Sequence, residues 1–347
     1  MGTLAEILVA VQDAPVRGLA GPMSYLRTFG PRADPATALT WGLIILSLVV
    51  VAIVTVLVVV GAVVRRRRET VATLTDLPVS RGASGRAWFY VGMPLTVVAL
   101  VGALTWTVEV LAAIDSPPVK PRLTIEVTGH QWWWQVRYLS PDPSQTFVTA
   151  NEIHIPTGEP VLVKLIGADV IHSFWIPALT GKTDTVPGQT NIAWLQTARP
   201  GVYQGQCAEY CGVQHAHMGL EVVAQPPAAF EAWRLDQLRP APVPPDVLAL
   251  AGRAVFIARC GACHTVQGVD TETNTARALA AGGVPGPDLT HLMARSNLAA
   301  DTVPNTVGGL AGWIGDPQAL KPGARMPTTY LSGPELSAVV HYLETLQ

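Results

Sequence analysis

Two long apolar stretches constrain this chain more than any other feature of its sequence. Residues 39–64 and 88–114 are almost free of charge, apart from Glu109 near the end of the second stretch. At about 1.5 Å of rise per residue, each is long enough to cross a hydrocarbon core of roughly 30 Å as a helix. A buried core helix is the alternative, but such helices are seldom so long and so uniformly apolar. The sequence therefore predicts a two-helix transmembrane hairpin in a lipid bilayer.

The charges near the hairpin predict its orientation. Four consecutive arginines, 65–68, begin the connecting segment 65–87, and an excess of basic residues is typical of the cytoplasmic side. The N-terminal segment 1–38 and everything after the hairpin are then expected on the outer side of the membrane. The chain as a whole has 23 basic and 25 acidic residues, a balance that indicates no nucleic-acid partner.

The sequence after the hairpin divides into two further domains. Residues 120–238 consist of short β-branched and aromatic runs separated by Gly, Pro and Asp, which is typical of a β-sandwich or barrel. A proline-rich linker, 239–245, precedes a region, 246–347, whose pattern is helical. The strand-like runs are 123–127, 161–166, 190–195 and 219–223, and the helical ones are 228–238, 246–259, 309–314 and 333–346.

A first group of metal-ligating side chains lies in the predicted β domain. Cys207, Cys211, His215 and Met218 fall within twelve residues, and His172 offers a second imidazole near another strand. Soft sulfur ligands combined with imidazole select copper over hard cations. A disulfide, a zinc site with two cysteines and two histidines, and two unrelated cysteines are the alternatives. Because a disulfide leaves His215 and Met218 without a role, and thioether is a poor zinc ligand, the spacing favours copper.

A second group lies in the helical domain. Cys260-Gly-Ala-Cys263-His264 is the C-x-x-C-H motif that attaches c-type haem through two thiols, with the histidine bound to iron. A zinc site or a redox dithiol leaves the adjacent histidine unexplained. We expect Met326, in a loop before the last helix, to be the second axial ligand, because a His/Met pair suits electron transfer. Met293 is the alternative, although its surroundings read as an ordinary helix with a core methionine.

Three consecutive tryptophans, Trp132, Trp133 and Trp134, follow Gly129-His130-Gln131. Neighbouring residues of a strand point to opposite sides, so all three cannot lie in the core. An exposed tryptophan is typical of an interface. Core packing combined with anchoring at the membrane surface is the alternative.

The combination of these motifs resembles cytochrome c oxidase subunit II of the haem–copper oxidase family, in its caa3-type form with a fused cytochrome c domain. The resemblance covers the hairpin, the β domain and the C-terminal hundred residues. It implies a cupredoxin-like β-sandwich and an all-α class I cytochrome c domain. In that family the first and last helices cross, so the small residue Gly252 would allow their close approach, with Phe256 facing a last helix that carries Tyr342.

The resemblance also implies a dinuclear copper A centre and one haem c. Bridging cysteines, terminal histidines and two weak ligands would form the copper site. These are Cys207 and Cys211, His172 and His215, and Met218 with the backbone carbonyl of Glu209, while His217 is a bystander.

Further roles follow from the same resemblance. Trp132 would be the point at which electrons reach the copper domain, with Trp133 beside it where the family commonly has tyrosine. The carboxylate of Glu209 would reach a magnesium ion shared with the large catalytic subunit. One departure is that residues 84–88 lack the glutamate that the family often places before the second helix, at the mouth of a proton channel.

The function implied is electron delivery to a terminal oxidase in a bacterial inner membrane, with the redox domains on the periplasmic side. A cytochrome c or a bc complex would donate the electrons. The large subunit I, together with other oxidase subunits, would reduce oxygen to water. Two alternatives remain: a relay subunit of a copper A-containing nitric oxide reductase, and a stand-alone membrane electron carrier.

Overall fold

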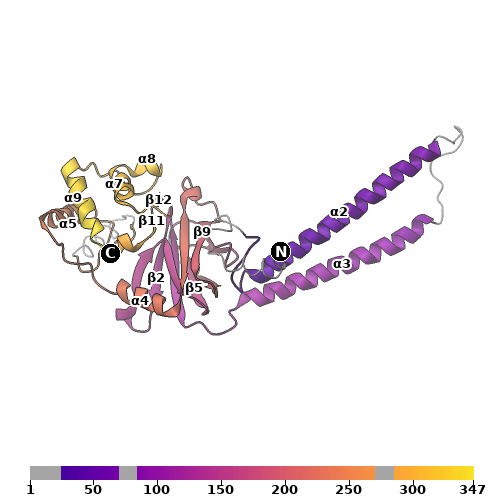
Figure 1. The fold of residues 1–347 in the computed structure, drawn as a ribbon, viewed down its shortest axis with the longest axis horizontal. Coiled ribbons are helices and arrows are strands. Elements are labelled where there is room, and N and C mark those ends of the chain that lie inside the picture. The colour runs from indigo at the N-terminus through magenta and orange to yellow at the C-terminus, as the bar shows by residue number, and fades with distance from the viewer. Residues whose placement is uncertain (1–24, 70–83, 270–284) are drawn as a thin grey trace, which may run out of the picture. The chain divides into compact units, whose positions relative to one another are not determined.

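The computed structural model describes residues 25–69, 84–269 and 285–347. Its contacts divide the chain into two compact units. One unit is Asp34–Ser116, and the other joins Pro117–Gln347 to the residues that precede Asp34. Figure 1 shows long helices in the first unit, and strands and shorter helices in the second.

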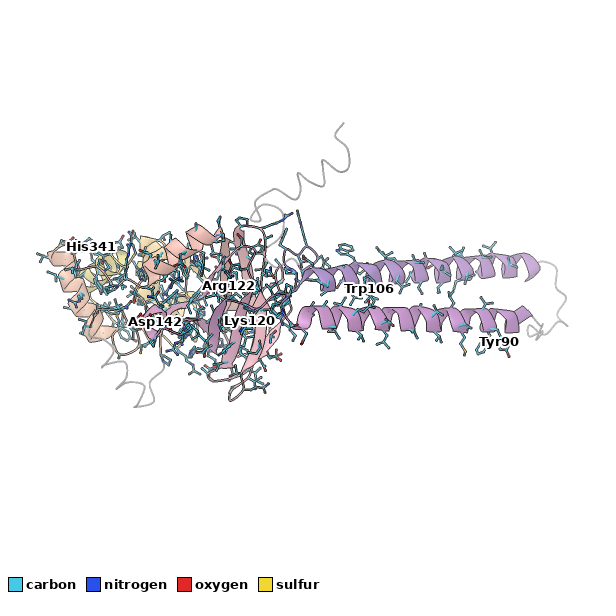
Figure 2. All side chains as sticks on the ribbon, turned by 90° about the horizontal axis from the view of Figure 1, so that it is seen from below. Tyr90, Trp106, Lys120, Arg122, Asp142 and His341 are labelled. Atoms are coloured by element: carbon cyan, nitrogen blue, oxygen red, sulfur yellow. The ribbon has the colours of Figure 1, made fainter. Side chains whose placement is uncertain are left out.

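The first unit is a pair of helices, α2 (Asp34–Glu69) and α3 (Ser84–Asp115). Both contain apolar stretches long enough to cross a membrane, and most of their described side chains are exposed, as lipid-facing side chains are. Trp106 of α3, labelled in Figure 2, packs against α2 at Gly42, where a Cβ atom would collide with the indole. The segment that connects the helices, residues 70–83, lies outside the described residues.

The β domain of the second unit consists of two five-stranded sheets, in the orders β3-β2-β1-β5-β8 and β4-β10-β9-β6-β7. Alternate residues of β1 and β5 are buried, which is the period expected when one side of each strand lies on a core. Strong β-formers such as Val, Ile and Phe supply that core. The strands are β1 (Leu123–His130), β2 (Trp133–Leu139), β3 (Phe147–Ala150), β4 (Glu152–Pro156), β5 (Val161–Gly167), β6 (His172–Trp175), β7 (Thr183–Thr185), β8 (Asn191–Leu195), β9 (Gly201–Cys207) and β10 (Gly219–Gln225).

A short helix, α4 (Pro227–Gln237), covers the outer strand β4. Every residue of β4 is buried, so this strand needs cover on both sides. Trp233 provides it by stacking on His154, with ring centroids 4.0 Å apart. The domain is a β-sandwich, as predicted.

The C-terminal domain is built mainly from helices. Gly252 on α5 lets α9 approach closely, because a Cβ atom there would collide with the backbone of Ala338. Phe256 and Tyr342 pack together one turn away, with ring centroids 5.7 Å apart. The fold class is confirmed, with the addition of a short strand pair, β11 and β12, that the sequence did not suggest. The elements are α5 (Val247–Arg259), β11 (Asn297–Leu298), β12 (Val303–Pro304), α7 (Val307–Gly315), α8 (Pro317–Leu320) and α9 (Gly333–Glu344).

Candidate functional site

The ligand-bearing segments of the β domain are brought together by strand pairing. Cys207 is the last residue of β9, and a loop with one turn of 3-10 helix leads from it to β10. His172 is the first residue of β6, which runs antiparallel to β9 with Phe174 opposite Cys207. A rigid sheet therefore fixes where both ligand segments emerge.

The sulfur atoms of this loop lie close together. The Sγ atoms of Cys207 and Cys211 are 3.8 Å apart, and the Sδ atom of Met218 is 3.8 Å from Sγ of Cys211. The Nδ1 atom of His215 lies 3.6 Å from the same Sγ, and the carbonyl oxygen of Glu209 lies 3.2 Å from Sγ of Cys207. Three further sequence-predicted residues thus place donor atoms around the two cysteine sulfurs.

His172 completes this group, and an aspartate orients it. Its Nε2–H donates to Oδ1 of Asp169 over 2.9 Å, so the ring turns Nδ1 toward the cysteines. Nδ1 is buried and makes no hydrogen bond within the described part of the chain. The ligand atoms of His172, Cys207 and Cys211 all lie within 4.8 Å of one another. Sequence reasoning missed Asp169, although a carboxylate three residues before a ligand histidine is a usable signal.

The electrostatics of the group suit a cation. Burial by itself raises the pKa of Asp169, but hydrogen bonds from His172 and from the backbone of Gln131 and Val170 outweigh it and hold the pKa at about 2. The hydrogen bond with Cys211 keeps the pKa of Cys207 well below its usual range. The pair of cysteines therefore carries a thiolate readily, and thiolate is the form that binds metal.

The donor set fits copper better than the alternatives. Neither Cys207 nor Cys211 forms a disulfide in the structure. Met218 is fully buried with its thioether beside Cys211, and a soft thioether favours copper over zinc. His217 is exposed and its ring bonds to Gln214 instead.

The haem motif opens onto a cavity lined by residues of the C-terminal domain and of the β domain. Cys260, Cys263 and His264 line this cavity together with Met326. Nδ1 of His264 bonds to the carbonyl oxygen of Pro287 over 2.8 Å, which leaves Nε2 as the free lone pair. These residues fit a haem with one histidine and one methionine ligand.

Two nearby residues are consistent with His264 and Met326 as the haem ligands. A Cβ atom at Gly286 would collide with the ring of His264, so only glycine leaves the imidazole room. Met293 packs on the core of the domain and does not line the cavity.

The three tryptophans have different surroundings. Trp134 is fully buried and packs edge-on against His172 and Phe174. Trp132 and Trp133 are partly buried and line the same cavity as the haem motif.

Trp132 is connected directly to the copper-ligand loop. Its indole N–H donates to the carbonyl oxygen of Cys211 over 3.0 Å, and the side-chain amide of Gln131 donates to the same oxygen over 2.7 Å. Gly212 makes this approach possible, because a Cβ atom there would lie 3.0 Å from the indole. Trp133 instead stacks on His130, with centroids 4.6 Å apart.

A lysine that the sequence did not single out lies at the same place. Lys321 is 2% exposed, and its Nζ donates to the carbonyl oxygens of Trp132 and Ala299. The only sequence signal was its position in the Met326 loop.

Two family descriptions match the chain. Residues 139–225 match "Cytochrome C oxidase subunit II, periplasmic domain", and residues 249–347 match "Cytochrome c". Among solved structures, the periplasmic domain of subunit II of cytochrome oxidase from Bradyrhizobium japonicum is 34% identical, with a TM-score of 0.32, and the match covers 34% of this chain and 95% of that one.

Curated relatives match over most of the chain. Cytochrome c oxidase subunit 2 of Alkalihalophilus pseudofirmus is 36% identical over 263 residues, which is 75% of this chain and 72% of the relative. The protein of the same name from Bacillus sp. (strain PS3) is 34% identical over 69% of this chain and 66% of its own length. The chain therefore belongs to the cytochrome c oxidase subunit 2 family, as a member with a fused cytochrome c domain.

Proposed function

We propose that this chain receives electrons at a covalently bound haem in its C-terminal domain and passes them to a pair of copper ions in its β domain. The family supplies the coarser statement: such a subunit brings electrons into a terminal oxidase, carries a copper A centre and works with the other oxidase subunits. One observation carries the finer proposal. Trp132 lines the cavity of the haem motif and also donates a hydrogen bond to the backbone of Cys211.

The haem assignment uses four residues. Cys260 and Cys263 would form the two thioether bonds, and His264 and Met326 would be the two protein ligands of the iron. The Pro287 carbonyl supports this by fixing the tautomer of His264 with Nε2 unprotonated. Such a haem supplies a one-electron couple with no vacant position for a substrate.

The copper assignment uses the sulfur-rich loop. Cys207 and Cys211 would bridge two ions, with His172 and His215 as terminal ligands and Met218 and the Glu209 carbonyl as weak ligands. Placement on a stiff sheet supports a relay function, because ligands that barely move need little reorganisation when one electron arrives.

The remaining roles concern partners. Trp132 would carry electrons between the sites, with Trp133 as a second aromatic residue in the cavity. The Glu209 carboxylate would share a magnesium ion with the large subunit, as the family resemblance implies. The donor would be a cytochrome c or a bc complex, and the hairpin would lie in the lipid of a bacterial inner membrane.

The test is a cofactor analysis of the full chain purified in detergent with its co-purifying subunits. We expect one haem that stays with the polypeptide after extraction with acidified organic solvent, and two copper ions with the electron paramagnetic resonance spectrum of a delocalised mixed-valence pair. Subunit I of an oxidase should co-purify.

Each part of the proposal has its own contrary result. An extractable haem would overturn covalent attachment, and one copper ion or zinc would overturn the dinuclear site. Co-purification with a nitric oxide reductase, or with no large subunit, would replace the oxidase assignment. A Cys263→Ser variant is the matched control, because it should weaken haem attachment and leave the copper signal intact.

A further inference from the structure

The loop that carries Met326 is fastened to the β domain by a buried lysine. The Nζ atom of Lys321 lies 2.9 Å from the carbonyl oxygen of Trp132 and 2.8 Å from that of Ala299. One carbonyl belongs to the β domain and the other to the C-terminal domain. A single amine therefore joins the two domains beside the tryptophan that bonds to Cys211.

Lys321 keeps both of its hydrogen-bond acceptors only while the C-terminal domain is docked on the β domain. A buried amine is unfavourable unless its N–H groups find acceptors. Burial lowers the pKa of Lys321 to about 7. The charged and the neutral amine both have enough N–H groups for two carbonyls. If the domains separated, one of the two acceptors would be lost.

Other contacts lie along the same boundary, and we call this set the domain seam. Each contact has one residue in a loop of the C-terminal domain. The other residue belongs to the β domain and lies near the copper-ligand loop or at the end of a neighbouring strand. They are Gln214 to the Pro322 carbonyl (2.5 Å), the Gly219 N–H to the Ala300 carbonyl (3.1 Å), the Ser296 N–H to the Glu152 carboxylate (2.9 Å), and Arg325 to Gln131 and Asp169.

The backbone at the seam adapts to these contacts. Ala299, Ala300 and Asp301 all have φ between 53° and 63°, a left-handed conformation that residues with a Cβ seldom adopt. The carbonyls of this turn accept hydrogen bonds from Lys321 and Gly219. Unusual backbone of this kind persists where surrounding contacts hold it.

We propose that Lys321 is a positioning residue that keeps the haem domain docked on the copper-ligand loop, with Trp132 in the wall of the haem cavity. This inference rests on the proposed function above. In the step that it serves, one electron leaves the reduced haem iron and reduces the copper pair. No bond is made or broken and no proton moves.

The first test measures amide hydrogen exchange in the full chain. The N–H groups of Gly219 and Ser296 donate across the seam, so we expect both to be protected in the wild type. Lys321→Met keeps the length of the side chain but removes its donors, and protection at both amides should fall about tenfold or more. Lys182→Met removes an exposed lysine from the same unit and should leave the protection unchanged.

The second test follows electron transfer from haem to copper after flash reduction of the haem. Lys321→Met should show a slower phase that the wild type lacks, while the haem absorption and the copper resonance stay the same. Lys321→Arg keeps N–H donors and should recover part of the fast phase. A merely structural role for Lys321 would change haem content or the spectra instead.

Two results would overturn the inference. One is unprotected exchange at Gly219 and Ser296 in the wild type, a measurement that decides the question even where Lys321→Met fails to fold. The other is a Lys321→Met variant that matches the wild type in both tests. A wild type whose copper never accepts an electron from its haem would instead refute the proposed function, whatever the amide exchange shows.

Discussion

Asp169 is expected to set the copper affinity of the β domain through His172. Its carboxylate accepts three hydrogen bonds: from Nε2 of His172 (2.9 Å), from the backbone of Val170 (2.8 Å), and from the backbone of Gln131 (2.7 Å). The first two reach Oδ1 and the third reaches Oδ2. In Asp169→Asn, an amide oxygen can replace Oδ1, but the amide NH2 group then points at the N–H of Gln131.

The size of the effect follows from the negative charge that Asp169→Asn removes from the hydrogen bond with His172. A hydrogen bond to a charged group contributes about 1.5–3 kcal/mol. Since about 1.4 kcal/mol corresponds to a factor of ten, the copper affinity of Asp169→Asn should fall about 10- to 100-fold. This is also the usual effect of replacing a residue that orients a ligand histidine.

The assay is a copper titration of the full chain against a competing chelator, with the resonance spectrum recorded at saturation. Asp236→Asn is the control, because Asp236 pairs with Arg239 on the surface of the same domain and such pairs contribute little. Equal affinities for Asp169→Asn and the wild type would refute the reasoning, since the orientation of His172 would then not depend on the carboxylate.

Three further predictions concern the haem and the stability of the second unit. Met326→Ala should open a coordination position on the haem iron and change its absorption spectrum, whereas Met293→Ala should leave the spectrum as it is; the reverse pattern would exchange their roles. Gly252→Ala should destabilise the haem domain by about 1–3 kcal/mol in chemical unfolding, because the new methyl group collides with the backbone of α9, and an unchanged midpoint would contradict that packing. Burial raises the pKa of Glu152, but hydrogen bonds from His154 and a backbone N–H outweigh it and hold the pKa below its ordinary 4.5. Its contribution to stability should therefore be complete above about pH 4.5 and be lost as the pH falls through the lower folded-state value, so that the melting temperature drops there in the wild type and less so in Glu152→Gln.

Much of the architecture could be predicted from local sequence. Segments 39–64 and 88–114 lie within the observed helices α2 and α3, because length and uniform apolarity are properties of a single segment. The strand-like run 161–166 lies within β5 for a similar reason, since alternate burial is a local period. The β11–β12 pair was missed because each strand has only two residues, too few to show a period.

The two ligand motifs could also be predicted from neighbouring residues in the sequence. Cys207 and Cys211, like Cys260 and His264, are held at useful distances by a few intervening residues, so their spacing alone indicates a metal and a haem. That spacing does not decide which distant residues, such as His172 or Met326, complete each site.

Only the tertiary structure decided those partners. His172 reaches Cys207 because β6 pairs with β9, and Asp169 then turns its Nδ1 toward the sulfurs. Met326 reaches the cavity of His264 while Met293 turns into the core, although both follow the haem motif in the sequence.

The three tryptophans and Lys321 show most clearly what the sequence could predict and what only the tertiary structure decided. The sequence indicated that Trp132, Trp133 and Trp134 could not all be buried, but not which one would be. The fold puts Trp134 in the core and joins Trp132 to Lys321, a residue 189 positions away. The sequence by itself determined the hairpin and indicated the two local motifs, Cys207 to Met218 and Cys260 to His264, because these depend on neighbours along the chain. The tertiary structure determined how the haem domain meets the copper loop, because contacts at that separation depend on sheet pairing and domain packing, which leave no local pattern.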